Sequence, residues 1–562
     1  MSKDALKYSG YSLLVLALIG IIILNVTFIN EKVKYHEFIN DFIPQALEKN
    51  IFSFPIKKGH DLFDPKTNHK ITKVYAPYGI SLDAISQNPD LRVSRFRTKK
   101  QIPINSNALL YLPKPYLIAG SFHNEAYPHD TSYSIELFMD LIKSAAIDRD
   151  YAQKLLEITK DQLDNFYYEV KHFSYPLNGN RAYFSTRSQA NTIVTNVKDY
   201  YEITKNKKWL KKKGIALAQG IIDYWLKGKV YLDKERQHFA FKWIADGSGK
   251  CFELMESYED HDYFYDKIHD QLEAYKELQE KDDLSLPHFA KGFDYKKVLT
   301  KKNKSNLGLS YFYYYSDRLS KVSGYDTNSI YGPFNAFTDD FIPADHNLKL
   351  YKSLNDFIFL LNETEAEPVT IKKYSNIAKR LKESINKYLW DEEQGYFFEY
   401  NYKREDLRTK YGFLSSAYAL WAEWFDIESS EDLEQLYKTF KYLKNNFKSK
   451  KGLYASNVET GIQWDKPYIW PIQQGMVIKG LMNYSKKLEN LNPKKSKKFK
   501  KFALEMAYNF NNSNFQDWLK ANGTSIKEKV TPEEETLFTG YATGENYTWN
   551  MATVLYFDSI LN

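Results

Sequence analysis

The chain has 562 residues, 43% of them hydrophobic and 16% aromatic, which is enough apolar material for a large core. Its 78 basic and 71 acidic residues leave a formal net charge of +7 and are scattered along the chain. The most basic block, residues 493–502, is typical of a solvated helix face, so we expect no nucleic-acid partner. Cys251 is the only cysteine, which excludes an intrachain disulfide.

An almost uninterrupted apolar run occupies residues 11–29, and about 20 such residues suffice to cross a bilayer. Lys3 and Lys7 precede it, as on the cytoplasmic side of a membrane anchor. Because no small-x-small cleavage site follows, the pattern predicts an uncleaved signal anchor over residues 1–30. The bulk of the chain would then be extracytoplasmic, periplasmic or extracellular. A cleaved signal peptide, leaving a secreted protein, is the alternative.

Helical spacing dominates the chain after about residue 105. Residues 31–60 are expected to form a tether and a first helix, and no Gly/Ser linker divides residues 61–562, which we treat as one domain. The clearest amphipathic stripe covers residues 371–389. Similar stripes predict helices over residues 133–146, 150–170, 191–211, 214–226, 262–279, 346–361, 411–425, 431–446, 473–488 and 498–510.

About a dozen helices and sparse strand-like alternation indicate an all-α fold. The exception is the segment 395–402, which follows Trp390 and predicts a short hairpin. Helices joined by long, motif-bearing loops suit a toroid of helical hairpins with a cleft at one end. A helical solenoid is the alternative, but no repeated sequence period supports it.

The loop over residues 321–348 is rich in Gly, Pro, Asn and Asp and also in aromatic rings and carboxylates. Within it, Ser323-Gly324-Tyr325-Asp326 places a carboxylic acid directly after an aromatic ring. If aromatic walls desolvate Asp326, its pKa rises, as a general acid near neutral pH requires. A turn-forming or helix-capping aspartate is the competing interpretation.

Other loops also carry polar and aromatic groups. Residues 112–133 hold two acids and two histidines, residues 178–189 hold amides and two arginines, and residues 463–471 combine indoles with a carboxylate. Such groups bind hydroxyl-rich ligands well. Further acids follow in residues 527–535 and 544–550.

Several rival chemistries do not fit these loops. His123, His129 and Asp130 match no common zinc spacing, so we expect no metal and no cofactor. There is no Gly-x-Ser-x-Gly elbow, no phosphate-binding loop and no partner motif for the lone cysteine. Carboxylates, arginines, amides and rings on a helical frame are the usual equipment of a glycosidase.

The quoted segments resemble the trehalases, inverting α,α-trehalose glucohydrolases with an (α/α)6 barrel, from about Asp61 to the C-terminus. The segments that carry the resemblance are Leu62-Phe-Asp-Pro-Lys-Thr, Leu112-Pro-Lys-Pro-Tyr, residues 120–133, Asn178-Gly-Asn-Arg-Ala-Tyr-Phe-Ser-Thr-Arg-Ser-Gln, Ser323-Gly-Tyr-Asp, Phe341-Ile-Pro-Ala-Asp-His-Asn-Leu and Gln463-Trp-Asp-Lys-Pro-Tyr-Ile-Trp. The chain departs from the family pattern at several points. The glycine run that follows the glutamate segment in trehalases is missing after Glu528-Lys-Val, and the stretch from there to Asn550 is shorter. Ser121 replaces an arginine, one residue is inserted between Phe122 and Glu125, His129 and Tyr325 each replace a tryptophan, and Ile469 replaces a glycine.

The resemblance implies roles for individual residues. Asp326 is the implied general acid and Glu528 the implied general base, with Glu535 and Glu545 as alternative bases. Arg181 would orient sugar hydroxyls or act as a structural strut. The implied substrate-binding residues are Phe122, Asp130, Asn178, Arg187, Ser188, Gln189, Arg318, Gly324, Gln463, Trp464, Asp465 and Glu545.

The function that follows is hydrolysis of the α,α-1,1 bond of trehalose to two glucose molecules with inversion, without a metal or cofactor. Two alternatives stay open. One is another inverting (α/α)6 α-glucosidase, acting on a glucosylglycerate or an oligosaccharide. The other is a membrane-anchored sugar-binding homologue without turnover.

Overall fold

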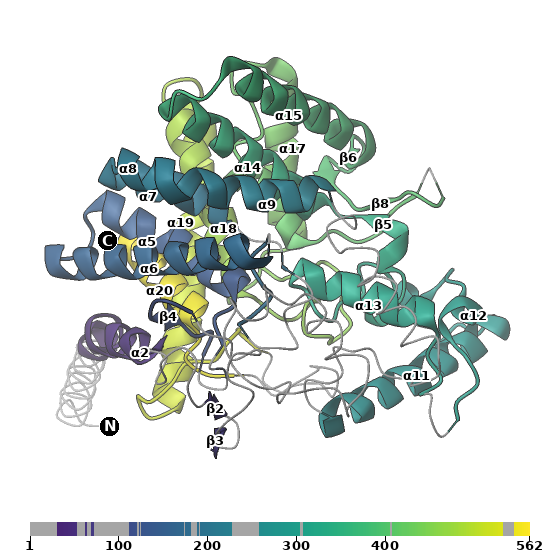
Figure 1. The fold of residues 1–562 in the computed structure, drawn as a ribbon. Helices are drawn as coiled ribbons and strands as arrows, with labels where there is room; N and C mark the ends of the chain where they lie inside the picture. The colour runs from purple at the N-terminus through teal and green to yellow at the C-terminus, as the bar shows by residue number, and fades with distance from the viewer. Residues whose placement is uncertain are drawn as a thin grey trace, which may run out of the picture.

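A computed structural model describes residues 31–52, 62–64, 69–71, 112–120, 123, 125–173, 175–180, 188–189, 192–227, 258–303, 307–404, 407–531 and 544–562. Most of these residues are helical (Figure 1). The longer helices are α5 (Pro128–Ser144), α6 (Arg149–Phe173), α7 (Ile193–Thr204), α9 (Ile215–Lys227), α11 (Tyr258–Glu280), α13 (Tyr311–Ser323), α14 (Ala344–Glu363), α15 (Pro368–Tyr388), α17 (Ser430–Asn446), α18 (Pro471–Lys487), α19 (Pro493–Lys520) and α20 (Thr548–Leu561). Short α-helices are α2 (Ile43–Lys49), α8 (Lys207–Trp209), α12 (Tyr295–Val298) and α16 (Tyr418–Trp421).

Helices of the main body contact one another in a closed order. Helix α5 packs on α7, α7 on α14, α14 on α16, α16 on α18, α18 on α20, and α20 again on α5. A second layer lies outside this ring, in which α6 packs on α5 and α7, α15 on α14, and α19 on α18 and α20. Consecutive helices thus form inner and outer members of hairpins, which is the toroid that the helical periodicity predicts.

The middle of the ring contains buried charges as well as apolar side chains. Lys479 of α18 contacts Glu136 and Asp140 of α5 at 2.7 and 2.8 Å. Glu136 also accepts hydrogen bonds from the Trp421 indole at 3.0 Å and from the Asn196 amide at 3.2 Å. Because α5, α7, α16 and α18 each contribute a member, this charged cluster joins four elements of the inner ring.

Helices α11 and α12 lie apart from the main body, at the right of Figure 1. They have a hydrophobic cluster of their own, built around Tyr265, Leu272 and Tyr313. This cluster brings α13, the element that leads into the Asp326 loop, against the two helices.

The strands are short and antiparallel. They are β1 (Ile51–Phe52) with β4 (Tyr116–Leu117), β2 (Leu62–Asp64) with β3 (His69–Ile71), β6 (Trp390–Asp391) with β7 (Tyr396–Phe397), and β8 (Tyr400–Asn401) between β5 (Phe341–Ile342) and β9 (Leu407–Arg408). In the predicted hairpin, Trp390 pairs with Phe397 and Asp391 with Tyr396, which confirms the hairpin after Trp390.

Two of the expected helices differ from the structure. The stripe over 191–211 is interrupted at Lys205, which has a left-handed φ of 51°, so it divides into α7 and α8. The expected helix over 411–425 is wrong: a 3-10 turn (Leu414–Ala417) precedes the four-residue α16. The backbone N–H of Leu414 donates to the Ala455 carbonyl at 2.8 Å, so tertiary pairing replaces a helical bond there.

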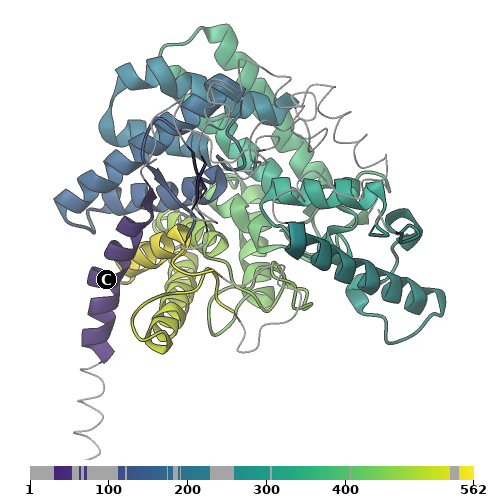
Figure 2. The same cartoon turned by 60° about the horizontal axis from the view of Figure 1, so that its bottom comes forward.

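The helix that begins the described part packs on the main body. It contains a π-helical turn (Phe38–Phe42) followed by α2, and in Figure 2 it lies beside the yellow C-terminal helices. Phe38 is fully buried against Phe515 and Trp518 of α19, and the Tyr35 hydroxyl donates to Asp558 of α20 at 3.2 Å. The predicted signal anchor, residues 1–30, lies outside the described residues. No helix that the structure describes combines the length and apolar composition needed to span a bilayer.

Candidate active site

The segment that carries Asp326 is held in place by its own backbone. Helix α13 ends at Gly324, whose φ of 87° is readily available only to glycine. The Tyr325 N–H donates to Ser323 Oγ at 3.0 Å, and the Tyr325 carbonyl accepts from Ser320 Oγ at 2.9 Å and Asn328 Nδ2 at 3.0 Å. These bonds fix the backbone conformation next to Asp326. Asp326 itself is only partly buried.

Five buried aromatic side chains from four segments form a closed circuit, here called the five-ring cluster. The ring centroids lie 4.9 Å apart for Tyr325 and Trp464, 3.7 Å for Trp464 and Trp470, 5.7 Å for Trp470 and Trp549, 6.4 Å for Trp549 and His129, and 6.5 Å for His129 and Tyr325. Trp464 and Trp470 are stacked, with 7° between their planes. The cluster therefore ties together the sequence motifs that are far apart in the chain.

Glu528 lies beside the five-ring cluster. Its side chain is 1% exposed, and the equally buried Lys529 ammonium lies 3.3 Å from its carboxylate. Lys529 also lies 4.6 Å above the Trp470 ring, and the Trp549 indole donates to the Glu528 carbonyl at 3.3 Å. The N–H of Glu528 donates to the Gly544 carbonyl at 2.7 Å, so the last two motif segments are paired.

The loop over residues 462–470 connects the acid segment to the base segment. On one side, the Trp464 N–H donates to the carbonyl of Thr327, next to Asp326, at 3.1 Å. On the other side, Ile469 and Val530 exchange backbone hydrogen bonds of 3.2 and 3.0 Å. The positions of Asp326 and Glu528 therefore depend on the same loop.

A third carboxyl group, Asp130, lies near Glu528. Burial raises the pKa of Asp130 to about 7, and the charge of Glu528 adds to this rise while His123 opposes it. Burial and the charges of Glu528, Asp130 and Glu125 also raise the pKa of Tyr547, whose phenol hydrogen-bonds Glu528. The site thus combines a carboxyl that is protonated up to neutral pH with a phenol that stays protonated.

Asp465 is buried inside the loop that connects the two segments. Thr460 Oγ1 donates to it at 2.7 Å and Ser456 Oγ at 3.2 Å. Burial raises its pKa to about 7 in spite of these bonds. Asp465, which the resemblance assigns to substrate binding, is therefore a fully buried side chain. It stabilises the loop through its two hydroxyl partners.

The other predicted residues occupy several settings. Gln189 donates to the Lys321 carbonyl at 3.1 Å, which brings its segment to the end of α13, and Ser188 is buried. Asn178 and Gln463 are buried, and within the described part of the chain their amide oxygens have no hydrogen-bond partner. Glu545 pairs with Lys527 through the backbone and its side chain is exposed.

Some predicted residues lie outside the described part of the chain. Phe122, Arg181, Arg187 and Glu535 belong to this group, and for Arg318 only the backbone position in α13 is described. These residues therefore stay predictions.

The structure also brings in residues that the sequence analysis did not assign to the site. Lys529 and Tyr547 contact Glu528, and Trp470 and Trp549 complete the five-ring cluster. All four lie within segments that the sequence analysis singled out, so proximity to the predicted site residues was the available signal. Their inward direction depends on backbone pairing between loops, which the sequence does not show.

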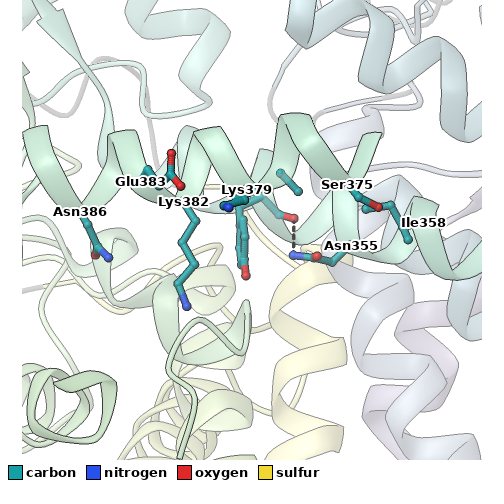
Figure 3. Close-up of a pocket in the computed structure, with 9 residues that line it drawn as sticks. Asn355, Ile358, Ser375, Lys379, Lys382, Glu383 and Asn386 are labelled. Atoms are coloured by element: carbon teal, nitrogen blue, oxygen red, sulfur yellow. Dashed lines mark hydrogen bonds between the residues drawn. The ribbon is translucent and has the colours of Figure 1, made fainter. Parts of the chain in front are cut away.

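A separate hollow of about 570 Å³ lies between α14 and α15, outside the residues above. Figure 3 shows Asn355 and Ile358 of α14 facing Ser375, Lys379 and neighbouring residues of α15. The Lys382 ammonium is bound at 3.0 Å by Asp432 and at 3.2 Å by the Trp424 carbonyl. This hollow contains no pair of carboxyl groups among its lining residues and is not an alternative hydrolytic centre.

The described residues include no group of three His, Cys, Asp or Glu side chains arranged to hold a metal ion. The 462–470 loop joins the segments of Asp326 and Glu528, and most glycosidases use a pair of carboxyl groups. The family profile "Trehalase" matches residues 81–557. The chain belongs to the trehalase family and is a glycoside hydrolase that takes a sugar substrate.

Solved structures of other glycosidases are similar to this chain. Neutral trehalase Nth1 of Saccharomyces cerevisiae matches with a TM-score of 0.54 at 18% identity, over 92% of this chain and 80% of that one. The mannosylglycerate hydrolase of Thermus thermophilus matches with a TM-score of 0.43 at 13% identity, over 85% of this chain and all of that one. At this identity, the likeness to the yeast enzyme shows the fold alone.

Proposed function

We propose that the protein hydrolyses the α,α-1,1 bond of trehalose with inversion. Asp326 donates a proton to the bridging oxygen, and Glu528 takes a proton from a water molecule that attacks the anomeric carbon from the opposite face. An inverting enzyme needs room for this water, so we expect the two carboxyl groups to stand about 6.5–9.5 Å apart. Asp130 and Asn178 would bind sugar hydroxyls.

The observation that carries the proposal is the shared support of the two carboxylate segments. The 462–470 loop is hydrogen-bonded to the residue after Asp326 and to Val530, two residues after Glu528. An acid and a base that act on opposite faces of one sugar need such a fixed relation, because a small misplacement costs much of the rate. The burial of Glu528 and the exposure of Glu545 favour Glu528 as the base.

The test is to incubate the purified full-length chain with trehalose and follow the first products by proton NMR. Inversion releases one β-glucose and one α-glucose from each molecule, whereas retention releases α-glucose only. Asp326→Asn and Glu528→Gln are each expected to lower kcat by about 10²–10⁴-fold. Glu434→Gln, at a side chain of α17 that is 68% exposed and outside every predicted site, is the matched control and should retain activity. Release of α-glucose alone, or full activity of either variant, would contradict the proposal.

A second candidate is an α-glucosidase of the same fold with a different leaving group. It is favoured by His129 and Tyr325, which stand in the five-ring cluster where the family pattern has tryptophans. Initial rates on trehalose, a glucosylglycerate and α-linked oligosaccharides separate the two, because the proposed enzyme prefers trehalose. A sugar-binding homologue without turnover would be active on none of them.

Two further features belong to the proposal. We assign the toroid to the (α/α)6 class, since the closed helix order and the outer layer support it. We also propose that residues 1–30 form an uncleaved signal anchor that leaves the catalytic domain outside the cytoplasm, on the strength of their apolar run and the preceding lysines. Protease accessibility of the domain in intact cells tests this, and complete protection would contradict it.

A further inference from the structure

A buried ion pair lies against the aromatic residue that precedes the proposed acid. Lys349 and Asp345 are one turn apart on α14, and their side chains are only 3% and 1% exposed. The Lys349 ammonium lies 3.0 Å from Asp345 and donates to the Tyr325 hydroxyl oxygen at 3.4 Å. It also lies 5.2–5.5 Å from the ring centroids of Tyr133, Tyr325 and Tyr418.

Such a pair is costly to bury, since two charges lose their hydration. Burial lowers the pKa of Lys349, while Lys349 lowers that of Asp345 despite burial. The mutual attraction and the contact with Tyr325 partly offset that cost. A hydrophobic pair would fill the same space at a lower cost in free energy. The position of the Lys349 charge beside Tyr325 is therefore the informative feature.

The contact of Lys349 with Tyr325 bears on Asp326 because Tyr325 directly precedes Asp326 in the chain. The Tyr325 backbone is fixed by Ser320, Ser323 and Asn328, and its ring packs on Phe413 at 4.8 Å and on Trp464 at 4.9 Å. The hydroxyl group at the far end of this ring is held by Lys349. The side chain next to Asp326 is therefore held at both ends, which leaves little freedom for the acid segment to rotate.

We propose that Lys349, held by Asp345, is a positioning residue for proton donation by Asp326 and acts through the hydroxyl of Tyr325. The proposal rests on the proposed function. It assigns to α14 a part in the acid step that is distinct from sugar binding. Loss of Lys349 should therefore slow hydrolysis most for those substrates whose leaving group needs a proton.

The experiment compares trehalose with α-glucosyl fluoride on the full-length chain. Glucose is a poor leaving group that must be protonated, whereas fluoride leaves with little help from an acid. Lys349→Met and Tyr325→Phe should each lower kcat on trehalose by about 10- to 100-fold, with KM little changed. Their rates on the fluoride should change by less than about threefold, because the acid step contributes little there. The double variant should lose no more than the larger single loss, since both act on one contact.

The same helix offers a matched control. Lys352 and Asp356 form a second buried pair of the same spacing, 2.7 Å apart and 14% and 4% exposed, and no hydrogen bond or ion pair in the described residues joins them to Tyr325. Lys352→Met should lower thermal stability without changing the ratio of trehalose to fluoride rates. Tyr325→Phe keeps the ion pair, and Asp345→Asn with Lys349→Met removes both charges, so the test does not depend on one variant that fails to fold.

The outcomes separate the two proposals. If the wild-type chain hydrolyses neither an α-glucoside nor the fluoride, or if Asp326→Asn loses both activities equally, the proposed function fails and this inference fails with it. If the wild type is active and Asp326→Asn spares the fluoride, but Lys349→Met and Tyr325→Phe lower both rates equally or neither, only the positioning role is overturned.

Discussion

The raised pKa of Asp130 predicts a pH-dependent contribution to stability. Burial and Glu528 raise this pKa from 3.8 to about 7, so the folded state holds a proton that the unfolded chain releases above about pH 4. The stabilisation is fully present below about pH 3.8 and is lost as the pH rises through 7. Asp130→Asn lacks this proton equilibrium, so the wild type should lose stability relative to the variant between pH 5 and pH 8.

The pKa shift of Asp130 sets the upper limit of this stability change, which is about 4 kcal/mol when complete. Thermal unfolding of both proteins at pH 5, 6, 7 and 8 measures it. We expect the difference in Tm, wild type minus variant, to fall by about 2–5 °C over this range. A difference that stays constant with pH would show that Asp130 ionises at its ordinary pKa.

Gly324 gives a second prediction at the scale of one residue. Its φ is 87°, and a Cβ there would lie 2.5 Å from Nε2 of the buried His129. Gly324→Ala should therefore add a clash of about 1–3 kcal/mol to the backbone cost of about 1–2 kcal/mol. Activity should fall too, because Asp326 is two residues away.

Gly292 is the matched control for this substitution. It has a similar φ of 81°, but no atom lies within 4 Å of an added Cβ. Gly292→Ala should cost only the backbone term and leave kcat unchanged. Equal losses of Tm and equal activities for the two variants would contradict the clash with His129.

At the scale of elements, the first described helix should contribute to stability but not to catalysis. Phe38 is fully buried against Phe515 and Trp518, so Phe38→Ala should lower the free energy of unfolding by about 3–5 kcal/mol. The kcat of the folded variant should be unchanged, since Phe38 contacts none of the predicted site residues that the structure describes. Val33 is 61% exposed, and Val33→Ala should change stability by about 0.5 kcal/mol or less. Thermal unfolding and kcat of both variants test this.

Most elements could be predicted from periodicity because their helices bury one face. The stripe over 371–389 matches α15, which has its apolar side against α14 and its charges outside. Helix α20 was missed because nearly all of its side chains are buried, so it shows no alternation of apolar and polar faces. Helix α13 was also missed, although Ser310 caps its first turn by accepting from the Tyr313 N–H.

The candidate site was predicted only in part, for a related reason. Motifs identified Asp326, Glu528 and the Trp464 loop, because the residue types are visible in the sequence. The ion pair of Lys349 with Asp345 and the contact of Lys529 with Glu528 depend on how α14 and the loops pack. The sequence gives no sign that Lys349, in a helix, or Lys529, beside a glutamate, is buried.

At the scale of the whole molecule, the charged cluster in the middle of the ring should be essential for folding. Lys479 pairs with Glu136 and Asp140 where α5 meets α18, and Lys479→Met would remove the ammonium group that contacts both carboxylates. We expect a loss of about 3–5 kcal/mol in the free energy of unfolding. Differential scanning calorimetry and circular dichroism would detect this as a lower Tm.

Lys487 on the same helix is the control for Lys479. It pairs with Glu423 at the surface, where the two side chains are 39% and 44% exposed. Lys487→Met should cost at most about 1 kcal/mol. If the two methionine variants unfolded at the same temperature, the inner cluster would not be a stabilising junction between helices.

The docking of Tyr35 and Phe38 against the last two long helices has a consequence for proteolytic processing. The residues just after the N-terminal apolar run already belong to the folded body, so there is no free spacer between Tyr35 and α2 for a protease to cut. If residues 1–30 form the proposed anchor, an enzyme that sheds an intact hydrolase must cleave before Tyr35. A cut further along would strip away an internal packing partner and yield a product that loses activity on mild warming.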